Sequence, residues 1–455
     1  MLKYAEVDFI KEITKKCKEI YIVGGAVRDY LLSRDTKDID IVIKENPLDL
    51  IKNKHFIVLD EELGIYRVFH KDFTIDVCKL QGEDIEEDLG KRDFTINAIA
   101  YDVKRRNFID PHGGIEDIKK KVIRTISEEN LKNDPIRLLR AFRFWLNLRL
   151  KLDRETLVKI IEHKSLINQV AKERIKEELV KIINNKHSFR AIKLLYKTSL
   201  LKEIIQELKE AEMLESGKLY GDTLAEHLIY SYLFAEELLN NLEKLIPRNL
   251  MEMLEEETES HLTKKTLIKL GALLHDIGKP RTFMIRDSVA TFWGHDRIGS
   301  KMTKDILKNL RFSSKTAKFV SKLVESHMRL HLLARAGTIT ERAKGRFFRE
   351  LDIDGIAVII VTLADSLASS GKSGFNYLLP YATEMIDFYI RLTERSELKK
   401  PLLDGYEIME LLNIGPGPRV GEAIRKLLDA QTEGIVTNKE EAKRFLMEVF
   451  SNGKR

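Results

Sequence analysis

Two stretches set the fold class of this 455-residue chain: Tyr21-Ile-Val-Gly-Gly-Ala-Val-Arg-Asp29 and, nine residues further on, Asp38-Ile-Asp-Ile-Val-Ile43. Short runs rich in Val and Ile, bounded by turn residues, are typical of strands. The glycine pair ends the first run where a helical segment begins, so the order is strand, turn, helix, strand. Phe73-Thr-Ile-Asp-Val77 adds a third expected strand. The pattern predicts an α/β unit at the N-terminus.

Asp38 and Asp40 point to one face of their expected strand, because side chains alternate between the faces of a sheet. Two adjacent carboxylates repel each other unless a cation lies between them, and Mg²⁺ prefers such oxygen ligands. Asp38 and Asp40 are therefore candidate catalytic ligands of Mg²⁺. Asp76, in the third expected strand, is a further candidate acidic ligand.

The glycine turn before these carboxylates is a candidate phosphate-binding element. Gly24 and Gly25 allow a ligand to approach the backbone closely, and the helix that follows offers free N–H groups. Arg28 adds a positively charged fork. A tight turn with no ligand is the alternative when this segment is considered alone.

Composition limits the class of protein. The formal net charge of +6 permits a nucleic-acid partner without requiring one, because binding needs a localised basic face. Two cysteines are too few for a disulfide framework, so Cys17 and Cys78 are expected to be reduced. Low mean hydropathy and no long apolar run argue against a membrane span. We expect a cytoplasmic protein without a membrane partner.

After about residue 124 apolar residues recur at helical spacing, and no convincing strand is found in the sequence. The stretch 240–260 is acidic and reads as a loop or insertion. Four parts are expected: an α/β head, a helical neck that binds RNA and selects nucleotides, a metal-binding domain and a helical tail, spanning residues 1–125, 126–210, 211–370 and 371–455.

Further motifs follow the first in order, beginning with Arg92-Asp-Phe-Thr-Ile-Asn-Ala-Ile-Ala100 and Asp110-Pro-His-Gly-Gly-Ile-Glu-Asp117. Asp134-Pro-Ile-Arg-Leu-Leu-Arg140 and Glu173-Arg-Ile-Lys-Glu-Glu-Leu179 complete the series. Together with the first motif, they resemble class II tRNA nucleotidyltransferases and bacterial poly(A) polymerases. The resemblance implies an α+β protein, with a polymerase-β-like nucleotidyltransferase head followed by an all-helical neck, body and tail.

The resemblance also implies residue roles. In the family the second motif contacts the ribose and triphosphate, which corresponds here to Arg92, Asp93 and Asn97. An acid and an arginine of the fourth motif read the base edge, and the matching nucleotide-binding residues are Asp134, Arg137 and Arg140. Asp134 and Arg137 share a helical face, which also fits an ordinary ion pair. Asn133 departs from the family, which usually has Glu there.

A second group of residues has the types and order of a metal site. Gly271-Ala-Leu-Leu-His-Asp-Ile-Gly-Lys-Pro280 places a histidine and an aspartate next to each other. Imidazole and carboxylate groups are good ligands for divalent metals. The pattern resembles the HD phosphohydrolase superfamily, and the residues that match its divalent-metal ligands are His227, His275, Asp276 and Asp365. His295 and His327 are candidates for a second ion or for substrate phosphate.

The tail contains Gly415-Pro-Gly-Pro-Arg-Val-Gly421 before an expected helix over residues 422–428. The start of that helix, with Arg419, can hold an RNA phosphate or can be purely structural. Lys399, Lys400, Arg425 and Lys426 are candidates for part of a surface that faces tRNA.

Members of this family add CC, A, CCA or poly(A) with the same motifs. Only eleven residues, 81–91, separate the third expected strand from the second motif. In CCA-adding relatives this interval carries a longer mobile loop, which is associated with the switch from CTP to ATP. The short interval therefore favours CC addition to the tRNA 3′ end, with a separate A-adding enzyme completing the terminus.

Several alternatives stay open. One is full CCA addition with CTP and ATP as substrates, and another is A or poly(A) addition. From a different class, the chain can act mainly as an HD phosphohydrolase whose head binds nucleotides.

Overall fold

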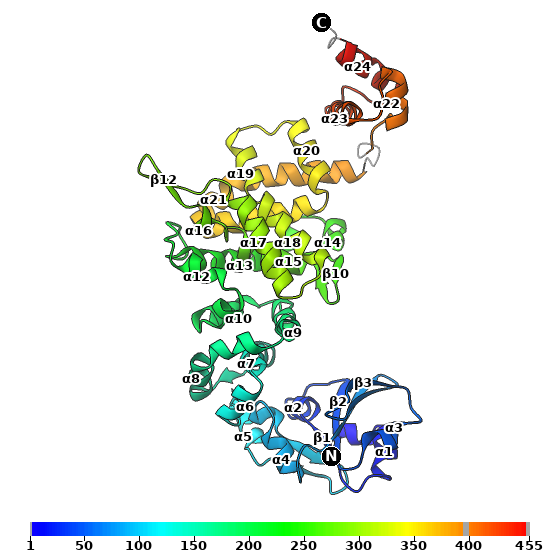
Figure 1. Ribbon diagram of the computed structural model, residues 1–455, viewed down its shortest axis with the longest axis vertical. Coiled ribbons are helices and arrows are strands. Elements are labelled where there is room, and N and C mark those ends of the chain that lie inside the picture. The colour runs from blue at the N-terminus through cyan, green and yellow to red at the C-terminus, as the bar shows by residue number, and fades with distance from the viewer. Residues whose placement is uncertain (1, 395–399, 452–455) are drawn as a thin grey trace. The chain divides into compact units, whose positions relative to one another are not determined.

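The computed structural model describes residues 2–394 and 400–451 (Figure 1). The chain forms two compact units. The first comprises residues 1–185 and 190–204, and the second comprises residues 186–189 and 205–455.

A seven-stranded mixed sheet forms the N-terminal part of the first unit, in the order β3-β4-β5-β2-β1-β6-β7. Only β2 and β5 run parallel; the other neighbours are antiparallel. The strands are β1 (Ile20–Val23), β2 (Asp38–Ile43), β3 (Phe56–Asp60), β4 (Ile65–His70), β5 (Phe73–Lys79), β6 (Ala100–Asp102) and β7 (Asn107–Ile109).

The centre of this sheet carries the motifs. Every residue of β1 is buried, which fits its uninterrupted Ile-Tyr-Ile-Val sequence. The first glycine motif leads from β1 into α2 (Gly25–Leu31), and β2 lies between β1 and β5. The three expected strands are present, and they are adjacent in the sheet.

Helices cover the sheet and continue beyond it. They are η1 (Lys3–Glu6), α1 (Asp8–Thr14), α3 (Pro47–Ile51), α4 (Ile85–Gly90), η2 (Thr95–Asn97), α5 (Gly114–Lys120), α6 (Glu128–Asn133), α7 (Ile136–Leu148), α8 (Arg154–Glu162), η3 (Lys164–Gln169), α9 (Lys172–Ile183), α10 (Phe189–Lys197) and α11 (Leu200–Ile204). Strands β8 (Val122–Ile123) and β9 (Lys151–Leu152) form a short parallel pair.

The second unit is mainly helical. Its elements are α12 (Glu207–Glu212), α13 (Leu224–Asn240), η4 (Leu242–Lys244), α14 (Arg248–Leu254), β10 (Glu257–Glu259), β11 (Leu262–Thr263), α15 (Lys264–Leu274), α16 (Lys279–Thr282), β12 (Met284–Arg286), β13 (Val289–Thr291), α17 (His295–Asn309), α18 (Ser314–Ser326), α19 (Met328–Arg335), α20 (Glu341–Leu351), α21 (Asp354–Glu394), α22 (Gly405–Leu412), α23 (Pro418–Thr432) and α24 (Lys439–Ser451). Helices α13, α15, α18 and α21 pack against one another (Figure 1).

Two expectations about this region are wrong. Strands do recur after residue 124, as short two-stranded pairs that are too brief to give a periodic pattern. The stretch 240–260 is not a loop: it contains η4, α14 and β10, and Leu250 and Leu254 anchor α14 to the core.

Helix α21 is long and apolar enough to cross a membrane by length and composition, but 78% of its most apolar window is buried inside the protein. Helix α21 is therefore a core helix of the second unit. It bends at Gly371, whose φ of 61° is not helical. The last three helices enclose a small core of their own, which includes Leu403, Ile408, Leu427 and Leu446.

Candidate functional site

A pocket of about 630 Å³ lies in the first unit, between the glycine turn, the second motif and α7. The lining includes every nucleotide-binding candidate except Asp134, namely Gly24, Gly25, Arg28, Arg92, Asp93, Asn97, Arg137 and Arg140. Of the two expected Mg²⁺ ligands, Asp40 lines the pocket and Asp38 does not. Gly24 has a φ of 65°, and a Cβ atom there would lie 3.0 Å from Arg92 Nη1 and 3.2 Å from Asp40 Oδ2. Any side chain at this position would therefore enter the pocket.

The three acidic residues of β2 and β5 lie on one face of the sheet. Asp40 pairs in register with Asp76, and Asp38 lies two residues before Asp40. The pKa of Asp40 is raised above its usual value, mainly because burial disfavours its charged form and further because Asp76 and Asp38 are negative; Arg92 opposes this effect. A divalent cation at Asp38 and Asp40 would relieve this repulsion, so the residues fit Mg²⁺.

Asp76 is paired with an arginine in this structure. Its two carboxylate oxygens accept hydrogen bonds from Nε and Nη2 of Arg67, both at 2.8 Å. This pair was not expected from the sequence, because the two residues meet only through the pairing of β4 with β5.

The second motif forms a buried network. Asp93 accepts a hydrogen bond from Asn97 Nδ2 at 2.8 Å and pairs with Arg140 Nη2 at 2.8 Å. Burial alone would raise the pKa of Asp93, but Arg140 and the hydrogen bond from Asn97 lower it below its usual value. Asn97 also accepts from Arg28 Nη1 at 2.8 Å. Asp93 and Asn97 therefore position two arginines at the pocket wall.

The two base-reading candidates of the fourth motif are both held by protein groups. Asp134 caps the end of α6 and accepts two hydrogen bonds from the guanidinium of Arg174, at 2.9 and 3.1 Å. Arg137 lies 3.7 Å from Asp134 but donates to main-chain carbonyls of Lys91, Arg92 and Asn130. Arg174 lies in the fifth motif, yet sequence reasoning did not single it out.

A second ion pair also involves α9 and ties it to α7. Arg143 on α7 donates to the buried Glu178 on α9 at 2.6 Å. The guanidinium groups of Arg28, Arg140 and Arg143 lie 5.2, 5.6 and 4.2 Å from the ring centre of Phe144. Arg143 and Phe144 also line the pocket and were not singled out from the sequence. Their signal is spacing, since they follow Arg140 by three and four residues and so share its helical face.

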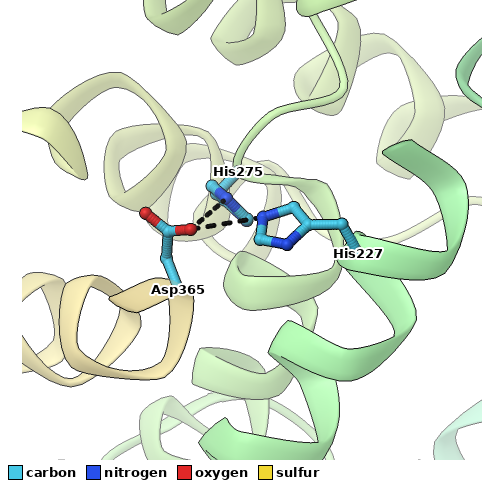
Figure 2. Close-up of side chains that lie close together, drawn as sticks. All are labelled: His227, His275 and Asp365. Atoms are coloured by element: carbon cyan, nitrogen blue, oxygen red, sulfur yellow. Dashed lines mark ion pairs between the residues drawn. The ribbon is translucent and has the colours of Figure 1, made fainter. Parts of the chain in front are cut away.

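In the second unit the four expected metal ligands meet. Figure 2 shows His227 from α13, His275 from the end of α15 and Asp365 from α21 converging. Asp365 Oδ1 lies 3.2 Å from His227 Nε2 and 3.5 Å from His275 Nε2. Asp276 Oδ2 lies 3.3 Å from His275 Nε2. Ligand atoms of His227, His275 and Asp365 lie within 4.8 Å of one another.

The same cluster includes the two further histidines. Asp276 Oδ1 lies 3.2 Å from His295 Nε2 and 3.5 Å from His327 Nε2. His275, Asp276 and His327 form a second group that can hold a metal. Two contacts were not expected: Lys279 pairs with Asp276, and His331 Nε2 lies 3.3 Å from Asp365 Oδ2. Lys279 was detectable, since it follows Asp276 by three residues.

The histidine tautomers suit metal binding. Nδ1 of His275, His295 and His327 lies 2.8, 2.8 and 2.6 Å from a main-chain carbonyl. A carbonyl only accepts, so each Nδ1 carries a proton, and whenever one of these rings is neutral its lone pair lies on Nε2. His275 Nε2 and both nitrogens of His227 are buried without a hydrogen-bond partner among the described residues. These orphaned atoms fit a divalent cation.

The tail residues that the sequence predicts to face tRNA do not all lie in one place. Arg425 and Lys426 line a groove of about 590 Å³ together with Arg342, Arg346 and Arg349 of α20. Lys400 is exposed, Lys399 lies outside the described residues, and Arg419 is in the first turn of α23, which is longer than the expected helix.

The groove contains an arginine cluster around one carboxylate, that of the buried Asp429. It accepts from Arg342 Nε at 2.7 Å and Arg346 Nη2 at 2.9 Å, and it also pairs with Arg349. One negative charge thus orients three guanidinium groups. The groove lining also includes Glu350 and Glu422, the latter paired with Lys426 at 3.1 Å, so it carries five basic and three acidic side chains.

Comparison with known proteins agrees with this layout. Residues 20–81 and 54–124 match the poly(A) polymerase head domain, 149–212 match a probable RNA- and SrmB-binding site of polymerase A, and 224–370 match the HD domain. The A-adding tRNA nucleotidyltransferase of Deinococcus radiodurans is 33% identical over 453 residues, which cover 93% of this chain and 94% of that protein.

Two further similarities extend over nearly the whole chain. The CC-adding tRNA nucleotidyltransferase of Thermus thermophilus is 31% identical over 445 residues, covering 94% of this chain and 93% of that protein. A solved structure of a CCA-adding enzyme with ATP superposes with a TM-score of 0.68 at 18% identity, covering 98% of this chain and 94% of that one. At that identity the structural likeness concerns the fold.

Proposed function

The chain belongs to the tRNA nucleotidyltransferases, the family whose members add CC, A or CCA to tRNA, and we propose that this member adds two cytidines from CTP. The observation that carries the proposal is the short segment 81–91 between β5 and the second motif, whose two ends are joined by hydrogen bonds.

In the proposed reaction the RNA 3′-oxygen bonds to the α-phosphorus of CTP, and the bond from that phosphorus to the β-phosphate oxygen breaks, releasing pyrophosphate. Mg²⁺ held by Asp38 and Asp40 would supply the charge that activates the hydroxyl and stabilises the leaving group. Arg28 and Arg92 line the pocket and bind the triphosphate, while Asn97 fixes the orientation of Arg28. We assign reading of the base to Arg137, which lines the pocket, together with Asp134, whose carboxylate is held by Arg174.

The segment 81–91 contains helix α4 and is held by several hydrogen bonds. Asp84 caps α4 by accepting from the main chain of Glu87 at 3.0 Å. Asp88 accepts from the main chain of Gln81 at 3.0 Å and from Arg92 Nη2 at 3.1 Å. Lys91 Nζ donates back to the carbonyl of Gln81 at 2.8 Å. Both ends of the segment are therefore tied together.

The segment 81–91 also holds Arg137, the arginine proposed to read the base. The carbonyl of Lys91, at its end, accepts from Arg137 Nη2 at 2.8 Å, and the next carbonyl accepts from Nη1 at 3.1 Å. A guanidinium fixed in one orientation presents one pattern of donors, whereas cytosine and adenine present different base edges. A fixed pattern supports the use of one nucleotide rather than a switch between two.

Replacing residues 81–87 with a longer glycine- and serine-containing loop is expected to permit A addition after CC. The longer segment releases the carbonyls that hold Arg137, so a second donor pattern becomes accessible. Gel analysis of RNA 3′ ends with CTP and ATP measures this outcome. A graft that still adds only cytidine, at the parent's rate, would count against the role of the segment.

A-addition is the second candidate, and the similarity to the Deinococcus radiodurans enzyme favours it. The two candidates differ in which nucleotide a tRNA ending in CC accepts. An A-adding enzyme extends that tRNA with ATP, whereas a CC-adding enzyme leaves it unchanged and extends a tRNA that lacks both cytidines.

The HD site is proposed to bind a divalent metal and to hydrolyse phosphoesters. His227, His275, Asp276 and Asp365 would hold the ion, which supplies a Lewis acid for the phosphate and an activated water. The amino group of Lys279, which pairs with Asp276, lies at the site and can neutralise a substrate phosphate.

The arginine groove between α20 and α23 is proposed to contact the tRNA backbone, and it extends the tail surface expected from Arg425 and Lys426. The double variant Arg346→Ala/Arg425→Ala is expected to weaken tRNA binding and to lower the slope of log affinity against log salt by about 2. Arg248→Ala, a matched loss of an exposed arginine on α14, should leave the slope unchanged. Equal slopes for the double variant and its parent would contradict the contact.

A further inference from the structure

Asn130 stands at the centre of the contacts that fix Arg137, although no motif of the sequence includes it. It lies in α6, and its side-chain amide donates to the carbonyl of Gly90 at 2.7 Å and to that of Arg92 at 2.8 Å. Only the nitrogen of the carboxamide can donate to two carbonyls, so this orientation is set by chemistry.

The same residue contacts Arg137 through its main chain. Arg137 Nη1 donates to the carbonyl of Asn130 at 3.1 Å and to the carbonyl of Arg92 at 3.1 Å. The carbonyl of Arg92 thus accepts from both Asn130 and Arg137. The Asn130 side chain therefore bonds the turn at residues 90–92, and the Arg137 guanidinium bonds carbonyls of the same turn.

These contacts restrict rotation of the Arg137 guanidinium group. Three of its five N–H groups are used on carbonyls of Lys91, Arg92 and Asn130. The turn that supplies two of these carbonyls is joined to α6 by the Asn130 amide. Without that amide, Gly90 and Arg92 lose a donor and the turn can shift, which allows Arg137 to rotate towards another donor pattern.

We propose that Asn130 is a positioning residue for nucleotide selection: by fixing the turn at Gly90 and Arg92 it keeps Arg137 in the orientation that selects one base. This inference rests on the proposed nucleotidyl transfer at the pocket. It does not depend on whether the preferred nucleotide is CTP or ATP, because it concerns the ratio between the preferred and the other nucleotide.

The test compares kcat/KM for CTP and ATP on one tRNA primer. Asn130→Ala is expected to lower the preference for the favoured nucleotide by about 10-fold, mainly by improving use of the other one. A merely structural role would lower both values together. Asn168→Ala removes an exposed side-chain amide that bonds Glu203 in the same unit, and it should leave the preference unchanged.

A double-mutant cycle tests whether the effect of Asn130 acts through Arg137. In an Arg137→Ala background, the change Asn130→Ala is expected to produce no further loss of preference, because the two residues act through one contact. A preference that falls equally in both backgrounds, or that does not fall at all, overturns the inference. If the alanine variant does not fold, Asn130→Gln keeps the amide but displaces it, and the same fall in preference is expected. A parent enzyme that prefers ATP would contradict CC addition while leaving this comparison intact.

Discussion

Replacing Asp40 with asparagine is expected to lower nucleotide transfer by at least about 1000-fold while the protein stays folded. The variant removes one of the two carboxylates proposed to hold Mg²⁺ next to the triphosphate pocket. Because burial and the neighbouring Asp76 and Asp38 disfavour the charge on Asp40, its loss should leave the melting temperature unchanged or raise it.

Two measurements separate this outcome from unfolding. Thermal unfolding with and without Mg²⁺ should show an ion-dependent shift for the parent and a smaller one for Asp40→Asn. Asp49→Asn changes an exposed aspartate of the same head and should transfer nucleotide as the parent does. Transfer by Asp40→Asn at a rate near that of the parent would rule out the assignment.

Replacing Asp365 with asparagine is expected to abolish metal retention in the HD site and hydrolysis of a phosphomonoester such as p-nitrophenyl phosphate. Asp365 is the only carboxylate that lies within 3.5 Å of both His227 and His275 among the described residues. Metal content per chain after gel filtration, measured by mass spectrometry, reports the first effect independently of activity.

The matched control is Asp305→Asn, on the exposed side of α17. It should retain the metal and the hydrolysis. Transfer of CMP to tRNA should survive in both variants, because the ligands lie in a different unit from the nucleotide pocket. Retention of a full complement of metal by Asp365→Asn would contradict the ligand assignment.

The sequence was informative where local geometry controls the outcome. The α+β fold and the family membership are confirmed, and the strand alternation that pairs Asp38 with Asp40 is a property of the backbone alone. The edge strand β3 was not among the expected strands, although Phe56-Ile-Val-Leu59 is itself a run rich in Val and Ile; Ile57, Val58 and Leu59 are all exposed in the structure.

Contacts that depend on how helices pack and strands pair could not be predicted from residue types alone. Arg174 reaches Asp134 only because α9 packs on α7, and Arg67 reaches Asp76 only through strand pairing. Asn130 was hidden for a different reason: its partners are main-chain carbonyls, which leave no mark in the sequence. Tertiary packing, rather than residue type, determines all three.

The most direct test of the central claim uses purified protein, Mg²⁺ and a tRNA that lacks its 3′ CCA, supplied with CTP, ATP or both. The 3′ ends are then read at nucleotide resolution. CC addition predicts two cytidines and no adenosine, even when ATP is present. A terminal adenosine after the two cytidines, a single adenosine added to a tRNA ending in CC, or a long adenosine tail would contradict it.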